Sequence, residues 1–152
     1  VTRYMCERNH SGLFFTCALV EQLGRDLKLK RCDVVKALGL QGVQMILGHA
    51  DVLHCEPIEK VSDDMQEHFV LPRGQFDNVA VARYAVPDVW AMGKVYARLI
   101  EDVSGQDDVA EMLVAVYTSW IDEKLCDYNS SFYYQSRDYI AECYRTGHVI
   151  DA

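Results

Sequence analysis

The residues of this chain that could do chemistry are scattered, and few stand at spacings that a reaction requires. Acidic pairs occur at Asp63-Asp64 and at Asp107-Asp108. Each pair stands where a helix should begin, and negative charge is favourable there because of the helix macrodipole. We therefore predict that these carboxylates cap helices and do not form an acid/base pair. The sequence contains no nucleophile elbow, phosphate-binding loop or dinucleotide-binding fingerprint.

The six cysteines and five histidines are potential metal ligands, but they follow no metal-binding pattern. Cys6 and His10 are four residues apart and His54 and Cys55 are adjacent, whereas a tetrahedral site needs three or four converging ligands. No two cysteines form a C-x-x-C pair. We predict no metal site and no cofactor, and we place His54 at the edge of the core. Free thiols at apolar positions are typical of a reducing compartment, so a cytoplasmic protein is expected.

Positive charge is concentrated in one stretch, which we interpret as a solvated helix face and loop. Its members are Arg25, Lys28, Lys30, Arg31 and Lys36. A helix, Gly39 and a second helix follow one another there, as in a helix-turn-helix. The second helix offers no basic residue before Lys60, and the formal net charge of −8 repels phosphate. Nucleic-acid binding is therefore kept only as an alternative. The longest apolar stretches are too short to span a bilayer, so no membrane contact is expected.

The most unusual stretch runs from residue 127 to residue 139 and is rich in tyrosine. Tyrosine supplies a large amphipathic contact area, and tyrosine and arginine are enriched at binding hot spots. The composition predicts a partner-binding surface, or alternatively rings that close the core with their hydroxyls at its rim. The candidate partner-binding residues are Tyr128, Tyr133, Tyr134, Arg137 and Tyr139.

Helical periodicity covers most of the 152 residues and predicts an all-α protein. The helices are expected over residues 11–23 (capped by Ser11 and stopped by Gly24), 31–38, 41–54, 63–69, 87–104, 108–125 and 132–144. Residues 79–84 fit either a short strand or extended chain. We expect two small helical modules packed together. These are an N-terminal helical module over 1–70, a linker or extended segment over 71–86, and a C-terminal three-helix module over 87–152.

The stretches 14–21, 33–38 and 46–54, the last of which ends on Leu53-His54, occur in a characteristic order. In that order they resemble an uncharacterised bacterial domain family that is often encoded near genes for ADP-ribosyltransferase-like toxins. The similarity covers about residues 13–70. The segment Tyr-Asn-Ser-Ser-Phe-Tyr-Tyr at 128–134 resembles companion proteins from the same gene neighbourhoods. The resemblance implies two joined modules with an antitoxin-like or accessory binding role, and it carries over no catalytic residue.

Two classes of function remain open besides nucleic-acid binding. Our first expectation is a non-enzymatic interaction module that binds another protein, such as a toxin-like enzyme, or itself. The alternative is a small enzyme whose site is assembled from distant residues, with His54, Cys55, Tyr133 and Arg137 as candidates. A single deep pocket that gathers titratable groups would mark the enzyme.

Overall fold

Seven α-helices and one short 3-10 helix make up the fold of the described residues. The computed structural model describes residues 2–151, and side chains from residue 12 onward. No strand occurs in this range, so the predicted all-α class is confirmed. The elements are α1 (Thr2–Leu27), α2 (Arg31–Leu53), α3 (Ile58–Phe69), α4 (Val89–Ser104), α5 (Val109–Tyr117), α6 (Ile121–Leu125), η1 (Phe132–Tyr134) and α7 (Arg137–Thr146).

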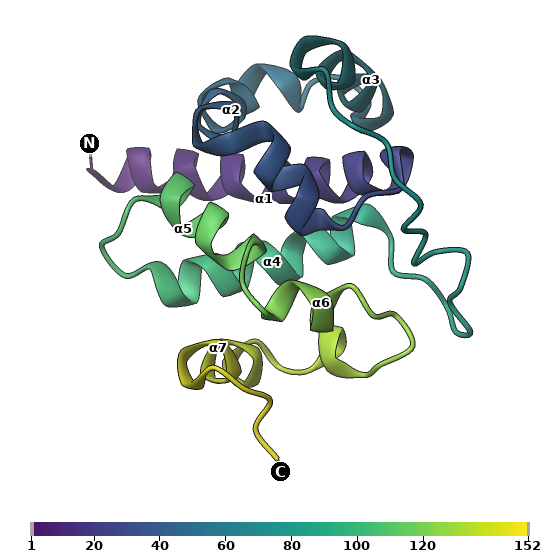
Figure 1. Cartoon of the computed structure of the whole chain (residues 1–152). Coiled ribbons are helices and arrows are strands. Elements are labelled where there is room, and N and C mark those ends of the chain that lie inside the picture. Colours follow the sequence, from purple (N-terminus) through teal and green to yellow (C-terminus); the bar gives the residue numbers. More distant parts are fainter. Residues whose placement is uncertain (1, 152) are drawn as a thin grey trace.

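Helix α1 runs through the middle of the molecule, with α2 and α3 on one side and α4 on the other (Figure 1). Consecutive residues from Cys17 to Val20 are completely buried, as expected for a helix that is covered all round. Helix α4 approaches α1 closely where Gly93 faces Ala18. A Cβ atom on Gly93 would lie 2.7 Å from the backbone nitrogen of Ala18, so this close crossing depends on the missing side chain.

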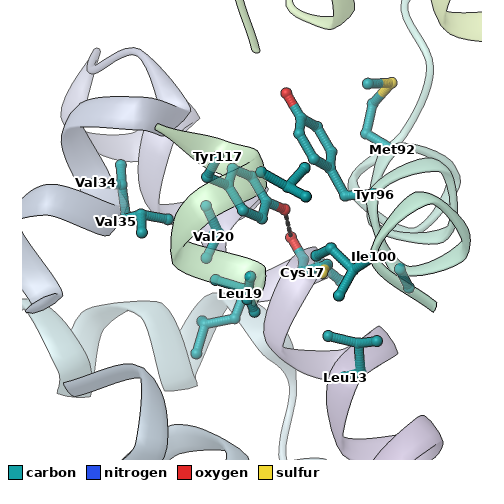
Figure 2. Close-up of a cluster of buried hydrophobic side chains, with 14 of the residues drawn as sticks. Leu13, Cys17, Leu19, Val20, Val34, Val35, Met92, Tyr96, Ile100 and Tyr117 are labelled. Atoms are coloured by element: carbon teal, nitrogen blue, oxygen red, sulfur yellow. Dashed lines mark hydrogen bonds between the residues drawn. The ribbon is translucent and has the colours of Figure 1, made fainter. Parts of the chain in front are cut away.

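One hydrophobic core crosses both halves of the chain. Figure 2 shows side chains of α1, α2, α4 and α5 that point toward one another around Tyr96 and Tyr117. The two tyrosine rings stack with centroids 4.1 Å apart and planes inclined by 7°. The Tyr117 hydroxyl donates to the backbone carbonyl of Cys17 at 3.5 Å. The core is therefore closed by aromatic rings whose polar tips have partners.

The first helix is longer at both ends than the sequence patterns predict. It begins at Thr2, and the predicted cap at Ser11 is wrong, because no glycine or proline precedes Gly12 to end a helix. At the other end the helix continues past Gly24. Lys28 instead takes the left-handed conformation that ends it (φ 57°), and the N–H of Leu29 donates to the carbonyl of Gly24 at 3.0 Å.

Helices α2 and α3 show one boundary that was predicted correctly and one that was wrong. Gly39 leaves the helical region (φ 69°, ψ 172°) and separates two helical runs within α2, as its position predicts. The predicted cap at Ser62 or Asp63 is wrong, because α3 begins at Ile58 directly after Pro57. Starting there places the apolar residues of α3 on one buried face, and these are Ile58, Val61 and Met65.

The C-terminal half has more breaks than three helices would have. The predicted helix over 108–125 is interrupted at Thr118 and Ser119, whose hydroxyls each donate to a backbone carbonyl of the preceding turn at 2.6 Å. Such local bonds compete with helix propagation. The predicted helix over 132–144 is the 3-10 turn η1 followed by α7, and Ser136 caps α7.

Residues 71–88 connect α3 to α4 and contain neither helix nor strand. We call this segment the linker, and it includes residues 71–86, for which the sequence analysis expected a linker or extended segment. It runs down one side of the molecule (Figure 1). The division into two modules stays a prediction, and α1 from one half packs along α4 from the other.

Candidate binding site

A buried ion pair joins α1 to α2 beneath the linker. Arg31 is 0% exposed and Glu21 is 1% exposed. Nη2 of Arg31 donates to Oε2 of Glu21 at 2.8 Å, and Nε of Arg25 donates to the same oxygen at 2.9 Å. Gly24 makes room for this arrangement, since a Cβ atom there would lie 2.7 Å from Nε of Arg31. The interpretation of Arg31 as part of a solvated basic face is therefore wrong, because the turn after α1 lays its side chain against Glu21.

The same network fixes the linker to the helices. Oδ1 of Asn78 accepts a hydrogen bond from Arg31 at 3.0 Å, and its Nδ2 donates to the carbonyl of Cys126 at 3.0 Å. Arg25 donates to the carbonyl of Pro87 at 2.6 Å. Two points of the linker are thus tied to charged groups of α1 and α2, and one of them also to the end of α6.

The charges of the buried pair hold each other in the ionised form. Burial alone would raise the pKa of Glu21, but the charge and hydrogen bond of Arg31 and the charge of Arg25 hold that pKa below its ordinary value. Burial would lower the pKa of Arg31, and Glu21 raises it. The Tyr128 hydroxyl also donates to Glu21, and burial together with the Glu21 charge raises the pKa of Tyr128. These groups therefore keep their protonation states near neutral pH and are suited to positioning.

A second buried carboxylate, Asp122 of α6, lies beside this network. Its Oδ1 accepts from the Tyr96 hydroxyl at 2.6 Å, and its Oδ2 accepts from the backbone N–H of Cys32 at 3.0 Å. Burial raises the pKa of Asp122 despite these hydrogen bonds. Burial also raises the pKa of Cys126, whose thiol lies 3.6 Å from Oδ1 of Asp122. A thiol held protonated in this way is a poor nucleophile.

A cavity of about 470 Å³ lies between the start of α2, the linker and α6. Its volume falls in the range of small-molecule pockets. Its walls carry large apolar side chains, namely Phe76, Val81 and Trp120. We call its buried polar lining the floor, which consists of Asn78, Asp122, Cys126 and Tyr128. We call its exposed charged lining the rim, which consists of Lys30, Glu123 and Asp127.

The structure divides the five predicted partner-binding residues into two groups. The ring of Tyr133 lies 5.7 Å from that of Tyr128 and 5.0 Å from that of Tyr134. Arg137 and Tyr139 belong to α7, where Arg137 forms a two-point ion pair with α4 and the Tyr139 hydroxyl donates to the C-terminal segment. Tyr128 is 2% exposed and closes the core, as the alternative interpretation expects, whereas Tyr134 is 67% exposed.

The four candidates for an enzyme site do not line the cavity. His54 and Cys55 are exposed at the end of α2, so the placement of His54 at the edge of the core is wrong. Residue 54 is the C-cap of α2, directly after its last turn, and the helical stripe that places it at the core ends there. Tyr133 and Arg137 lie elsewhere in the C-terminal half, and the cavity gathers a different set of titratable groups.

Cysteine and histidine show no metal-binding arrangement in the part of the chain with described side chains. No three metal-ligating side chains converge there, and all five cysteines of that part are free thiols. Cys6 and His10 lie outside it.

Of the polar residues that build this site, sequence reasoning singled out Tyr128 but missed Glu21, Asn78 and Asp122. Glu21 had a signal, because it is the one charged member of an otherwise apolar helical stripe, and a buried charge requires a partner. No local sequence signal marked Asn78 or Asp122. The Asn78 side chain is hydrogen-bonded to Cys126, 48 residues away along the chain, and the Asp122 side chain to Tyr96, 26 residues away.

No protein-family model, curated protein or solved structure matches this chain. No helix among the described residues is both long enough and apolar enough to cross a bilayer.

Proposed function

We propose that this chain is a non-enzymatic binding protein that docks another protein through the outer face of the linker and through the exposed Tyr134. The observation that carries the proposal is a linker without regular structure that is held in place from beneath and displays large apolar side chains. The family resemblance noted from the sequence adds a class of partner, a toxin-like enzyme that this chain would bind.

The linker presents apolar side chains to solvent in one neighbourhood. Val81 and Tyr84 are each 67% exposed. Tyr134 belongs to the segment that Asn129 joins to the linker, and it is equally exposed. Burial of apolar surface contributes roughly 25 cal/mol per Å², and tyrosine is enriched among the residues that dominate interfaces. A protein that covers these side chains would gain binding energy from them.

The same linker is fixed in one conformation by side-chain hydrogen bonds. Asn129 accepts from the N–H of Arg83 at 2.7 Å and donates to the carbonyl of Val81 at 3.2 Å. Asn78 accepts a hydrogen bond from the buried Arg31, and Pro87 accepts one from the partly buried Arg25. A preorganised surface loses little conformational entropy on binding. Long ordered connections without regular structure are usually functional, which also favours this surface.

The chemistry of the cavity supports binding over catalysis. Both oxygens of Asp122 accept internal hydrogen bonds, and the Tyr128 hydroxyl is engaged with Glu21. Burial raises the pKa of the Cys126 thiol and disfavours its thiolate. A general acid, base or nucleophile must instead be free to exchange a proton with substrate.

The proposal is tested by photo-crosslinking from the exposed linker. A benzophenone amino acid at position 84 should form a one-to-one adduct with a defined protein in cells that express both. The same group at position 60, an exposed site on α3, should not form that adduct. The purified partner should then lose about 30-fold or more in affinity for Tyr84→Ala, which is the magnitude of a hot spot.

Two results would contradict the proposal. One is the absence of a stoichiometric partner together with a monomer in solution. The other is a partner that binds Tyr84→Ala and Val81→Ser as tightly as the unsubstituted chain. A homodimer that dissociates on Tyr84→Ala would replace the second protein with a second copy of this chain.

A further inference from the structure

The geometry points to a second binding activity, in which the cavity between α2, the linker and α6 takes a small amphipathic amine. By this we mean an ammonium or guanidinium group carried on an aromatic or branched apolar stem. The inference goes beyond the proposed protein docking, because it concerns the cavity. Val81 belongs both to the cavity lining and to the docking surface, whereas Tyr84 and Tyr134 belong to the docking surface alone. Either activity can fail while the other holds.

The walls of the cavity favour an apolar and preferably aromatic stem. Phe76 and Trp120 contribute rings from the linker and from the residue that precedes α6, and Val81 adds an aliphatic side chain. Phe76 is held in place, because its N–H donates to the carbonyl of Lys28 at 2.9 Å and its ring lies 5.9 Å from the Arg31 guanidinium carbon. Rings that are already positioned can stack on a ligand at little entropic cost.

The floor of the cavity offers few free hydrogen-bonding groups. The amide of Asn78 is used on both sides, by Arg31 and by the carbonyl of Cys126. Asp122 accepts through both oxygens, and Tyr128 donates to Glu21. A polar group pushed into this floor would lose its hydration without gaining a partner. The inner part of the ligand should therefore be apolar.

The rim selects the charge of the outer part. Glu123 and Asp127 are exposed carboxylates, and Lys30 is the one cation among the lining residues. The rim therefore carries two carboxylates against one ammonium, and the whole chain has a formal net charge of −8. This balance attracts a cation to the mouth and repels an anion. Aromatic walls add to the preference, because a cation is attracted to the face of tryptophan in particular.

The test uses three probes of nearly equal size that differ in charge. They are 4-(trifluoromethyl)benzylamine, 4-(trifluoromethyl)benzyl alcohol and 4-(trifluoromethyl)benzoate, and each is titrated while its fluorine NMR signal is observed. The amine should bind with a Kd of about 1 mM, as expected for a fragment of this size. The alcohol should bind more weakly, and the benzoate most weakly. Backbone amide shifts should place the amine at residues 76–81 and 119–123 and leave α3 unchanged.

Charge-removing variants distinguish an effect of the rim carboxylates from an effect of the net charge of the whole chain. Glu123→Gln/Asp127→Asn should weaken binding of the amine by about three- to tenfold and leave the alcohol unchanged. The matched control Asp63→Asn/Glu67→Gln changes the net charge equally on the exposed face of α3 and should have no effect. An arginine-containing tripeptide is then added as a competitor of the amine. Competition would indicate that the cavity takes the side chain of a peptide or protein, and failure to compete would indicate that it takes a free small-molecule amine.

Benzoate binding as tight as that of the amine would overturn the inference. So would an unchanged amine affinity in Glu123→Gln/Asp127→Asn, or amide shifts that lie away from the cavity. Absence of binding by all three probes would overturn it as well. Folding of each variant is checked by circular dichroism. Glu123 and Asp127 are both exposed, so their substitution should leave the fold intact.

Discussion

Replacing Glu21 with glutamine should strongly destabilise the fold, because it leaves the charge of Arg31 buried without a counter-ion. The other partners of Arg31 are neutral, namely the carbonyl of Leu29 at 2.7 Å and Oδ1 of Asn78 at 3.0 Å. Loss of one member of a buried ion pair costs about 3–5 kcal/mol. We expect about 3 kcal/mol for Glu21→Gln, since the amide oxygen still accepts one hydrogen bond. That is a large fraction of the roughly 5–15 kcal/mol by which a domain is stable.

Urea unfolding followed by circular dichroism measures this loss, with the m-value as a check on two-state behaviour. Arg31→Met and the double variant complete a thermodynamic cycle. The double variant should lose about 1.5–3 kcal/mol less than the sum of the single variants, because it leaves no unpaired charge in the core. The control is Asp102→Asn, which removes a partner of Arg137. That arginine is 42% exposed, so the loss should not exceed about 1 kcal/mol.

The depressed pKa of Glu21 adds a pH signature to the same experiment. The pKa lies below its ordinary value of 4.5 in the folded state, so the contribution of the carboxylate is present above pH 4.5 and is lost as the pH falls through the folded-state pKa. Glutamine does not titrate, and the gap between the two proteins should therefore narrow in acid. Equal stability of Glu21→Gln and the unsubstituted protein at pH 7, or strict additivity in the cycle, would refute the reasoning.

Three other sites yield predictions of stability. Gly93→Ala should lower the free energy of unfolding by about 2 kcal/mol or more, because its Cβ would lie 2.7 Å from the nitrogen of Ala18. Gly48→Ala is the control, because a Cβ there meets open space. Thermal unfolding compares the two variants, and equal effects would contradict the close crossing of α1 and α4. Val70 has a left-handed backbone (φ 50°), which strains a β-branched residue, and its side chain is 85% exposed. Asparagine adopts this conformation more readily, so Val70→Asn should raise the free energy of unfolding in urea by about 1 kcal/mol. A decrease would contradict this reasoning. The raised pKa of Asp122 makes its ionisation increasingly costly to the fold as pH rises above its ordinary value of 3.8. Asp122→Asn should therefore gain stability relative to the unsubstituted protein as the pH rises from 3.8 through the raised folded-state pKa, and a constant difference would exclude this.

Most helices of this protein could be predicted from local sequence. Asp108 caps α5 by accepting from the N–H of Glu111 at 3.1 Å, and Gly105 and Gly147 end α4 and α7 with positive φ, as their residue types predict. These signals are readable because both partners of a cap lie within a few residues of each other. The breaks that were missed, such as the one at Thr118, depend on which rotamer a hydroxyl adopts, and residue type alone does not determine that.

The sequence by itself determined the all-α class and most helix ends, because helical periodicity and caps are properties of neighbouring residues. Tertiary structure alone decided that Arg31 is buried, that Tyr128 belongs to the core, and that a cavity opens beside Trp120. Arg31 is hydrogen-bonded to Asn78, which is 47 residues away in the sequence, and Tyr128 is hydrogen-bonded to Glu21, which is 107 residues away. Which polar residues become buried partners depends on the path of the chain between them, and that path is set by packing of the whole core.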